Sequence, residues 1–175
     1  MSIRYTISIY TENNVGLLNR ISAIFLKRHI NIISITSSES EITDIFRFII
    51  VVDVDENQII KLIKQIEKQI EVISAFFHTN DEIIYLETAL YKVKSESLFK
   101  ERQIQNIIKE SRANMVTVKP EFFVIEKTGW REETEELYEK LKTYGLMQFV
   151  RSGRIAVSKD SMEISKLLNI KKNYE

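Results

Sequence analysis

Residues 11–21, with the sequence TENNVGLLNRI, have the types and spacing needed to bind a small charged molecule. Gly16 permits a ligand or another backbone to approach closely. The backbone amides at the start of the helix expected here, together with the positive end of its dipole, provide a site for a carboxylate. The carboxamide of Asn13 donates and accepts hydrogen bonds, which suits the ammonium and carboxylate groups of a zwitterion. An ordinary turn in which Asn13 or Asn14 caps the helix explains the same residues, and the residue types alone leave both interpretations open.

Further residues complete this candidate site. Asn31, at the start of the next expected strand, supplies a second carboxamide. The aliphatic side chain of a small ligand would be buried against Leu17, Leu18 or Ile32. The candidate binding residues are therefore Asn13, Gly16, Leu17, Leu18, Asn31 and Ile32.

No pattern in the sequence indicates catalysis or metal binding. The two histidines, His29 and His78, are far apart, the four glycines are isolated rather than grouped in a phosphate-binding loop, and cysteine is absent. His29 stands where the first helix is expected to end, so we predict a left-handed backbone there rather than a ligand role. The acidic residues within 132–136 fit a helix start, where the dipole favours negative charge. We therefore predict no catalytic residue, no metal site and no cofactor bound to this chain.

The composition narrows the class of protein. Lysine and arginine number 25, as do aspartate and glutamate, so the formal net charge is zero and the pI is near 6.8. Nonspecific nucleic-acid binding needs a surplus of cations, so no nucleic-acid partner is expected. No apolar run approaches the roughly 20 residues that span a bilayer, and the N-terminus has no signal-peptide organisation. These features predict a soluble, cytoplasmic protein without membrane contact.

The pattern of residues 1–78 predicts a ferredoxin-like domain with the order βαββαβ. Strands are expected at 3–11, 31–36, 45–52 and 72–77, and helices over 17–28 and 59–70, with a loop at 37–40. Both helices then cover one face of the sheet, so the other face is solvated or covered by a partner. Tyr10, Ile32 and Thr36 are candidates for that second face.

A second unit with the same order of elements follows. We expect a linker at residues 79–82, a second ferredoxin-like domain at residues 83–160 and a tail at residues 161–175 that is frayed from Lys166 onward. One helix is expected over 98–112, Pro120 and Glu121 form a hairpin turn, and Gly145 ends a helix. The fold class is therefore α+β with two tandem ferredoxin-like domains. Each unit is so small that its hydrophobic core alone would give only marginal stability, so we expect a dimer or a larger assembly.

Several stretches are similar to a known family. YTENNVGLLNRI at residues 10–21 and RHINI at residues 28–32 resemble the opening motif of ACT domains, which are regulatory modules that bind amino acids. ALYKV at residues 89–93, REET at residues 131–134 and FVRSG at residues 149–153 extend the resemblance to the small regulatory subunits of acetolactate synthase. The resemblance covers the chain from Arg4 to Asp160.

The resemblance implies a non-catalytic subunit that binds the catalytic large subunit, raises its activity and transmits feedback inhibition by a branched-chain amino acid, with valine expected first. The catalytic partner is expected to use thiamine diphosphate, Mg and FAD. In the family the effector lies between two ACT domains, which implies that Asn13 and residues 16–18 of one chain face Asn31 and Ile32 of its neighbour. Two alternatives stay open: a free-standing ACT-domain sensor that regulates a different enzyme, and a small catalytic ferredoxin-like protein.

Overall fold

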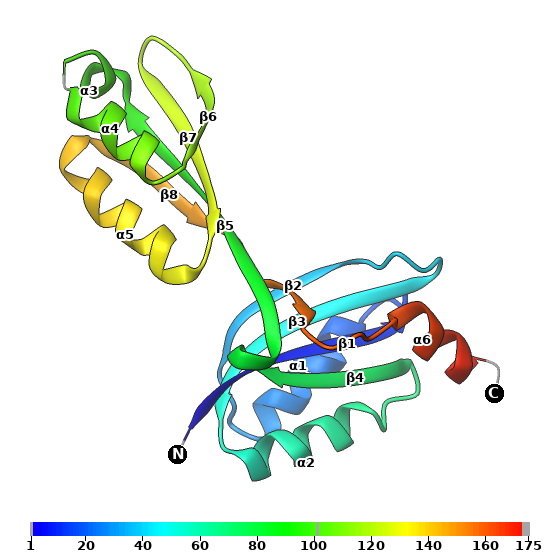
Figure 1. The fold of residues 1–175 in the computed structure, drawn as a ribbon. Helices are drawn as coiled ribbons and strands as arrows, with labels where there is room; N and C mark the ends of the chain where they lie inside the picture. The colour runs from blue at the N-terminus through cyan, green and yellow to red at the C-terminus, as the bar shows by residue number, and fades with distance from the viewer. Residues whose placement is uncertain (1, 101, 173–175) are drawn as a thin grey trace. The chain divides into compact units, whose positions relative to one another are not determined.

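The computed structural model describes residues 2–100 and 102–172, which form two compact units (Figure 1). The first unit contains the chain up to residue 85 together with the segment from residue 154 onward, and the second contains residues 86–153. Each unit has its own antiparallel sheet and its own apolar core, so each is described separately.

The first unit follows the predicted βαββαβ order. Its elements are β1 (Ile3–Glu12), α1 (Leu17–Lys27), β2 (Ile32–Glu39), β3 (Ile45–Val54), α2 (Glu56–Ile66) and β4 (Val72–Thr79). The strands lie in the order β2-β3-β1-β4, so β2 forms one edge of the sheet. The sheet is antiparallel, and its register places Ile7 of β1 opposite Ile50 of β3.

The alternation in β1 determines which face of the first sheet is apolar. Tyr5, Ile7 and Ile9 are buried against the apolar stripes of α1 and α2, which include Ile21 of α1 and Leu62 of α2. The alternate residues of β1 lie on the opposite face because successive side chains of a strand point to opposite sides. Helical periodicity and strand alternation therefore agree on one core, and the predicted arrangement of the first unit is confirmed.

Three local details differ from the sequence-based expectations. Helix α1 is preceded by Gly16, not by a capping asparagine, and no side chain caps it. Strand β2 continues to Glu39, because Ser37 and its neighbours pair with β3 where a loop was expected. Ile32 packs against the helix-side core, so its predicted place on the second face is wrong.

The second unit repeats the layout with shorter helices. After the short 3-10 helix η1 (Asn80–Glu82) come β5 (Ile83–Lys94), α3 (Ser95–Lys100), α4 (Arg102–Glu110), β6 (Asn114–Val118), β7 (Phe122–Gly129), α5 (Arg131–Leu141), η2 (Lys142–Tyr144) and β8 (Leu146–Arg151). The strands lie in the order β6-β7-β5-β8. The single helix predicted at 98–112 is instead α3 followed by α4, with residue 101 outside the described residues. The turn at Pro120 and the left-handed Gly145, with φ 77°, are confirmed.

Tyr91 is the largest buried side chain of the second core. It is fully buried among Val93, Phe123 and Leu137, and its phenol donates a 2.6 Å hydrogen bond to the backbone oxygen of Thr134. Burial raises the pKa of Tyr91 far above its ordinary value, so the phenol stays protonated and remains a donor. This bond links β5 to α5.

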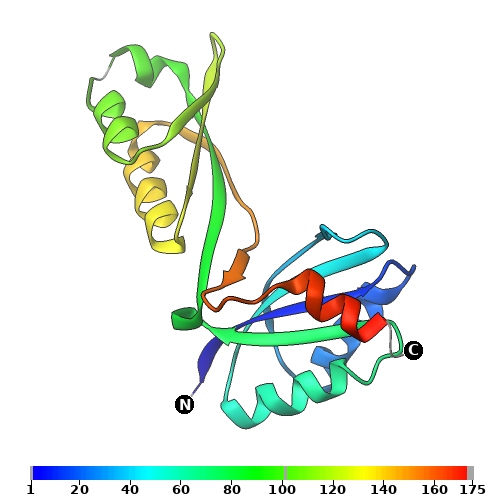
Figure 2. The same cartoon turned by 45° about the vertical axis from the view of Figure 1, so that its right-hand side comes forward.

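The segment from residue 154 to residue 172, called the return segment here, belongs to the first unit. It forms β9 (Ile155–Ser158), which pairs with β5, and α6 (Ile164–Lys172). Figure 2 shows it on the sheet face opposite α1 and α2. Leu168 of α6 is fully buried in a cluster with Tyr10 and Ile45. The predicted fraying is therefore wrong for residues 166–172, whereas residues 173–175 lie outside the described residues.

Arg154 attaches the return segment to the first unit. Its guanidinium is buried, donates to Thr6 Oγ1 and to Asn80 Oδ1 at 2.8 Å each, and lies 3.6 Å from the ring centroid of Tyr85. A buried cation needs such partners because desolvation is otherwise costly. These contacts position β9 and the residues that follow it.

Among the helices that the structure describes, none has the length and apolar character needed to cross a membrane.

Candidate functional site

The predicted turn between β1 and α1 borders a hollow of about 240 Å³ on the surface of the first unit. Its lining includes four of the predicted residues, Asn13, Gly16, Leu17 and Leu18. Leu17 is anchored in the core, whereas Leu18 is about half exposed and offers an apolar contact. The sequence-based grouping of these four residues therefore corresponds to one surface feature.

The backbone of this turn leaves the start of α1 open. Gly16 has φ 84°, a left-handed conformation that glycine adopts without the strain of a Cβ. The Leu17 N–H donates to the Asn14 oxygen at 3.3 Å, but no side chain caps the helix. The N–H groups of Leu18 and Asn19, which have no acceptor within the helix, are therefore available to an anion at the hollow.

The two asparagines of the turn have different roles. The Asn14 carboxamide donates to Glu12 Oε2 at 3.1 Å and so holds the turn in place. The Asn13 side chain is exposed, and within the described part of the chain it has no hydrogen-bond partner. The interpretation of Asn13 or Asn14 as the helix cap is therefore wrong, and the Asn13 carboxamide is free to bind.

Asn31 and Ile32 do not join the other candidate residues within one chain. Asn31 is exposed just before β2, and Ile32 is half buried against the core. Neither residue lines the hollow. The structure of one chain therefore does not bring these two residues to the hollow.

Sequence reasoning missed three residues that line the hollow. These are Ser37 of β2 and the aromatic residues Phe46 and Phe48 of β3, whose ring centroids are 5.4 Å apart. These residues reach the hollow because Ser37 is paired with Phe48 in the sheet. No local signal could have found them, since their position depends on the register of two strands.

Of the acidic residues within 132–136, Glu133 serves the start of α5 as predicted, whereas Glu135 pairs with Arg151 and Glu136 with Lys140. The Trp130 N–H donates to Glu133 Oε2 at 2.8 Å, which satisfies one of the open amides at this helix end. Among the described residues, no group of three or more His, Asp or Glu side chains is placed to hold a metal ion.

Each of the two units matches a known protein-family model. The ACT domain family model matches residues 5–71, and the model for the small subunit of acetolactate synthase matches residues 86–160. The acetolactate synthase small subunit of Bacillus subtilis is 37% identical over 158 residues, covering 90% of this chain and 91% of the relative. The Mycolicibacterium smegmatis protein of the same name is 34% identical over 155 residues, covering 89% of this chain and 91% of the relative.

A solved structure supports the same conclusion. The crystal structure of the acetolactate synthase small subunit from Thermotoga maritima superimposes with a TM-score of 0.82 at 26% identity, covering 91% of this chain and 99% of that chain. The fold and the β1–α1 turn thus define an ACT-domain protein with a second ferredoxin-like unit. The chain belongs to the acetolactate synthase small-subunit family. Membership confirms the prediction of a non-catalytic subunit of a branched-chain amino-acid biosynthetic enzyme.

Proposed function

We propose that this chain activates the catalytic subunit of acetolactate synthase and transmits feedback inhibition by a branched-chain amino acid, with valine the expected effector. The observation that carries the proposal is the hollow at Gly16, where uncapped helix amides lie beside the unpartnered carboxamide of Asn13. The amides suit the carboxylate of an amino acid, Asn13 suits its ammonium group, and Leu18 with Phe46 suits a small aliphatic side chain.

We also propose that the complete site forms between two copies of this chain. Strand β2 is an edge of its sheet, and an edge strand presents unpaired N–H and C=O groups that can bind a second strand. If two β2 strands pair antiparallel about a two-fold axis between Ser34 and Ile35, Ile32 of one chain lies opposite Ser37 of the other. Ser37 lines the hollow, so this pairing supports a role for Ile32 and the preceding Asn31 of the neighbour.

The function is tested by assaying acetolactate formation by the catalytic subunit alone, with this chain, and with this chain plus valine, leucine or isoleucine. We expect activation by the chain, inhibition by at least one of the three amino acids, and no turnover by the chain alone. Absence of activation, together with failure of the two proteins to co-purify, would favour the alternative of a free-standing sensor. The cytoplasmic location stays a prediction.

The effector site is tested by Asn13→Ala and Asn31→Ala. Each variant loses a hydrogen bond to a charged group, so we expect amino-acid affinity to fall by about 10- to 150-fold while activation persists. Asn106→Ala, on an exposed face of α4, is the matched control and should bind normally. Calorimetry measures binding, and thermal melts verify that the variants are folded. Unchanged binding in both folded variants would place the effector elsewhere.

A further inference from the structure

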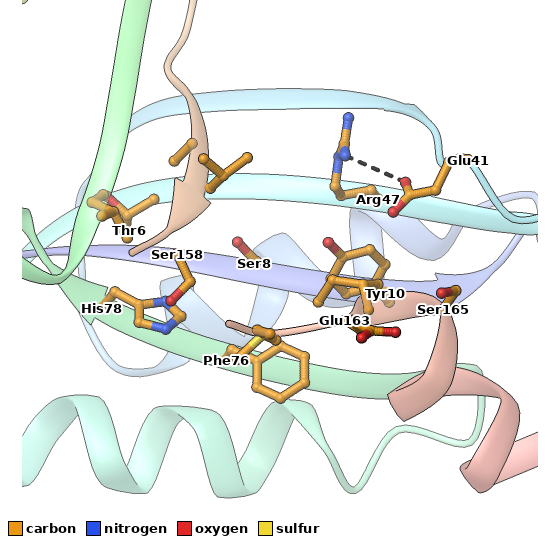
Figure 3. A pocket seen from close by; sticks show the side chains of 15 residues that line it. Thr6, Ser8, Tyr10, Glu41, Arg47, Phe76, His78, Ser158, Glu163 and Ser165 are labelled. Atoms are coloured by element: carbon orange, nitrogen blue, oxygen red, sulfur yellow. Dashed lines mark ion pairs between the residues drawn. The ribbon is translucent and has the colours of Figure 1, made fainter. Parts of the chain in front are cut away.

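A second pocket lies on the opposite face of the first sheet, beneath the return segment (Figure 3). It has a volume of about 330 Å³, at the lower end of the range of roughly 300–1,000 Å³ found for small-molecule sites. Strands β1, β3 and β4 form its floor, and residues 156–158 and 162–165 form its cover. It shares no lining residue with the hollow at Gly16, and one chain forms it completely.

The floor of the pocket is polar because it is formed by the alternate residues of β1 whose side chains point away from α1 and α2. Thr6, Ser8 and Tyr10 project from β1 toward the return segment, and His78 of β4 lies at the end near Thr6 (Figure 3). Burial raises the pKa of Tyr10, although the nearby Arg47 guanidinium opposes this effect. The phenol therefore stays protonated at neutral pH and can donate a hydrogen bond.

Charges of both signs line the pocket. The Arg47 guanidinium of β3 lies 3.7 Å from the Glu41 carboxylate, which is longer than a hydrogen bond, and donates a weak 3.4 Å bond to Ser38 Oγ. Glu163 lines the pocket from the return segment and also forms an exposed ion pair with Lys166 at 2.6 Å. Arg47 thus offers donors to a carboxylate, while the two glutamates offer acceptors to an ammonium group.

The remaining wall is apolar. Phe76 of β4, Ile83 and Met162 line the pocket, with Val157 and Ile164 of the return segment. An apolar lining with a few convergent polar groups is typical of a site that binds a small organic molecule. From these features we infer that the pocket binds a small zwitterion with an apolar body, its carboxylate on Arg47, its ammonium group between Glu41 and Glu163, and its body against Phe76 and Met162. This inference goes beyond the proposed function, because it does not need a second chain or an enzyme partner.

The test uses the full chain carrying Asn13→Ala and Asn31→Ala, so that binding at the Gly16 hollow is removed. L-Leucine is titrated and followed by calorimetry and by NMR shifts of Ser8, Tyr10 and Phe76. 4-Methylpentanoate, which lacks the ammonium group, and 3-methylbutylamine, which lacks the carboxylate, are the matched probes. We expect leucine to bind at least about tenfold more tightly than either, because each analogue loses one charged contact. No shift at these residues with millimolar leucine would overturn the inference.

Two variants in this background test the charged groups. Arg47→Gln should lower leucine affinity at least about tenfold. Glu163→Gln changes an exposed side chain and should remove much of the preference for leucine over 4-methylpentanoate without affecting folding. Arg4→Gln is the control, since Arg4 lies on the same sheet face in an ion pair with Asp53 but outside the pocket. Equal leucine affinity in the Arg47 variant and the Arg4 control would overturn the inference. These experiments measure leucine binding and not regulation of the catalytic subunit. A negative result at this pocket is therefore distinguishable from failure of the proposed function.

Discussion

The backbone of His29 lies in the left-handed region, with φ 55°, immediately after the C-terminal end of α1. The Ile30 N–H donates to the Phe25 oxygen and the His29 N–H to the Leu26 oxygen, both at 3.0 Å. These bonds close the helix end and require the left-handed conformation, which is strained for residues with a Cβ. His29 is exposed, so its ring contributes little that would offset this strain.

We therefore expect His29→Gly to raise the free energy of unfolding of the first unit by about 0.5–1 kcal/mol. Urea denaturation measures the change. His29→Ala keeps a Cβ and should not stabilise the unit, so it is the matched control. A loss of stability in the glycine variant would indicate that the imidazole makes a contact that outweighs the relief of strain.

At the scale of elements, α6 is attached to the first sheet through Leu168, with Ile164 packed against the same cluster. Leu168 is fully buried with Tyr10 and Ile45, whereas Leu167 is 38% exposed. The spacing of Ile164, Leu167 and Leu168 is that of a helix face, and this signal could have predicted α6 within the tail.

Leu168→Ala should lower the free energy needed to detach α6 by about 2–5 kcal/mol, because the substitution removes buried apolar atoms and leaves a cavity that the neighbouring side chains do not fill. Hydrogen exchange at the α6 amides measures the opening. NMR titration of Tyr10 gives a second readout: its pKa is raised by burial, so detachment of α6 should lower it toward the ordinary tyrosine value. Leu167→Ala should change both measurements little. Equal effects of the two variants would contradict the role assigned to Leu168.

At the scale of the whole molecule, the two apolar cores have no residue in common. Ile7 of β1 is fully buried in the first core, and Ile125 of β7 is fully buried in the second. Local unfolding takes place in cooperative units that share a packed core, so a cavity in one core should first lower the stability of the unit that contains it.

We expect Ile125→Ala to lower the stability of the second unit by about 2–5 kcal/mol, with weakened hydrogen-exchange protection in β7 and little change in β1. Ile7→Ala is the reciprocal variant and should weaken β1 while protection in β7 persists. Loss of protection in both units from either substitution would mean that they unfold as one.

The sequence alone was sufficient for features that depend on neighbouring residues. Alternation in β1, the apolar stripes of α1 and α2, and the left-handed positions of His29 and Gly145 all follow from local steric and hydrophobic rules. The order βαββαβ then follows from the succession of these elements. Four residues of the candidate site were also found this way, because they lie in one turn.

Features formed by distant segments were decided only by the tertiary structure. Ser37, Phe46 and Phe48 reach the hollow through strand register, and a one-residue slip would turn each side chain to the other face. The pocket over Tyr10 exists because the return segment packs on strand β1, from which it is separated by more than a hundred residues in sequence. Arg154 holds the return segment there through its hydrogen bond to Thr6. Local patterns show which face of an element is apolar or polar but not what covers it, because burial depends on contacts between segments far apart in sequence.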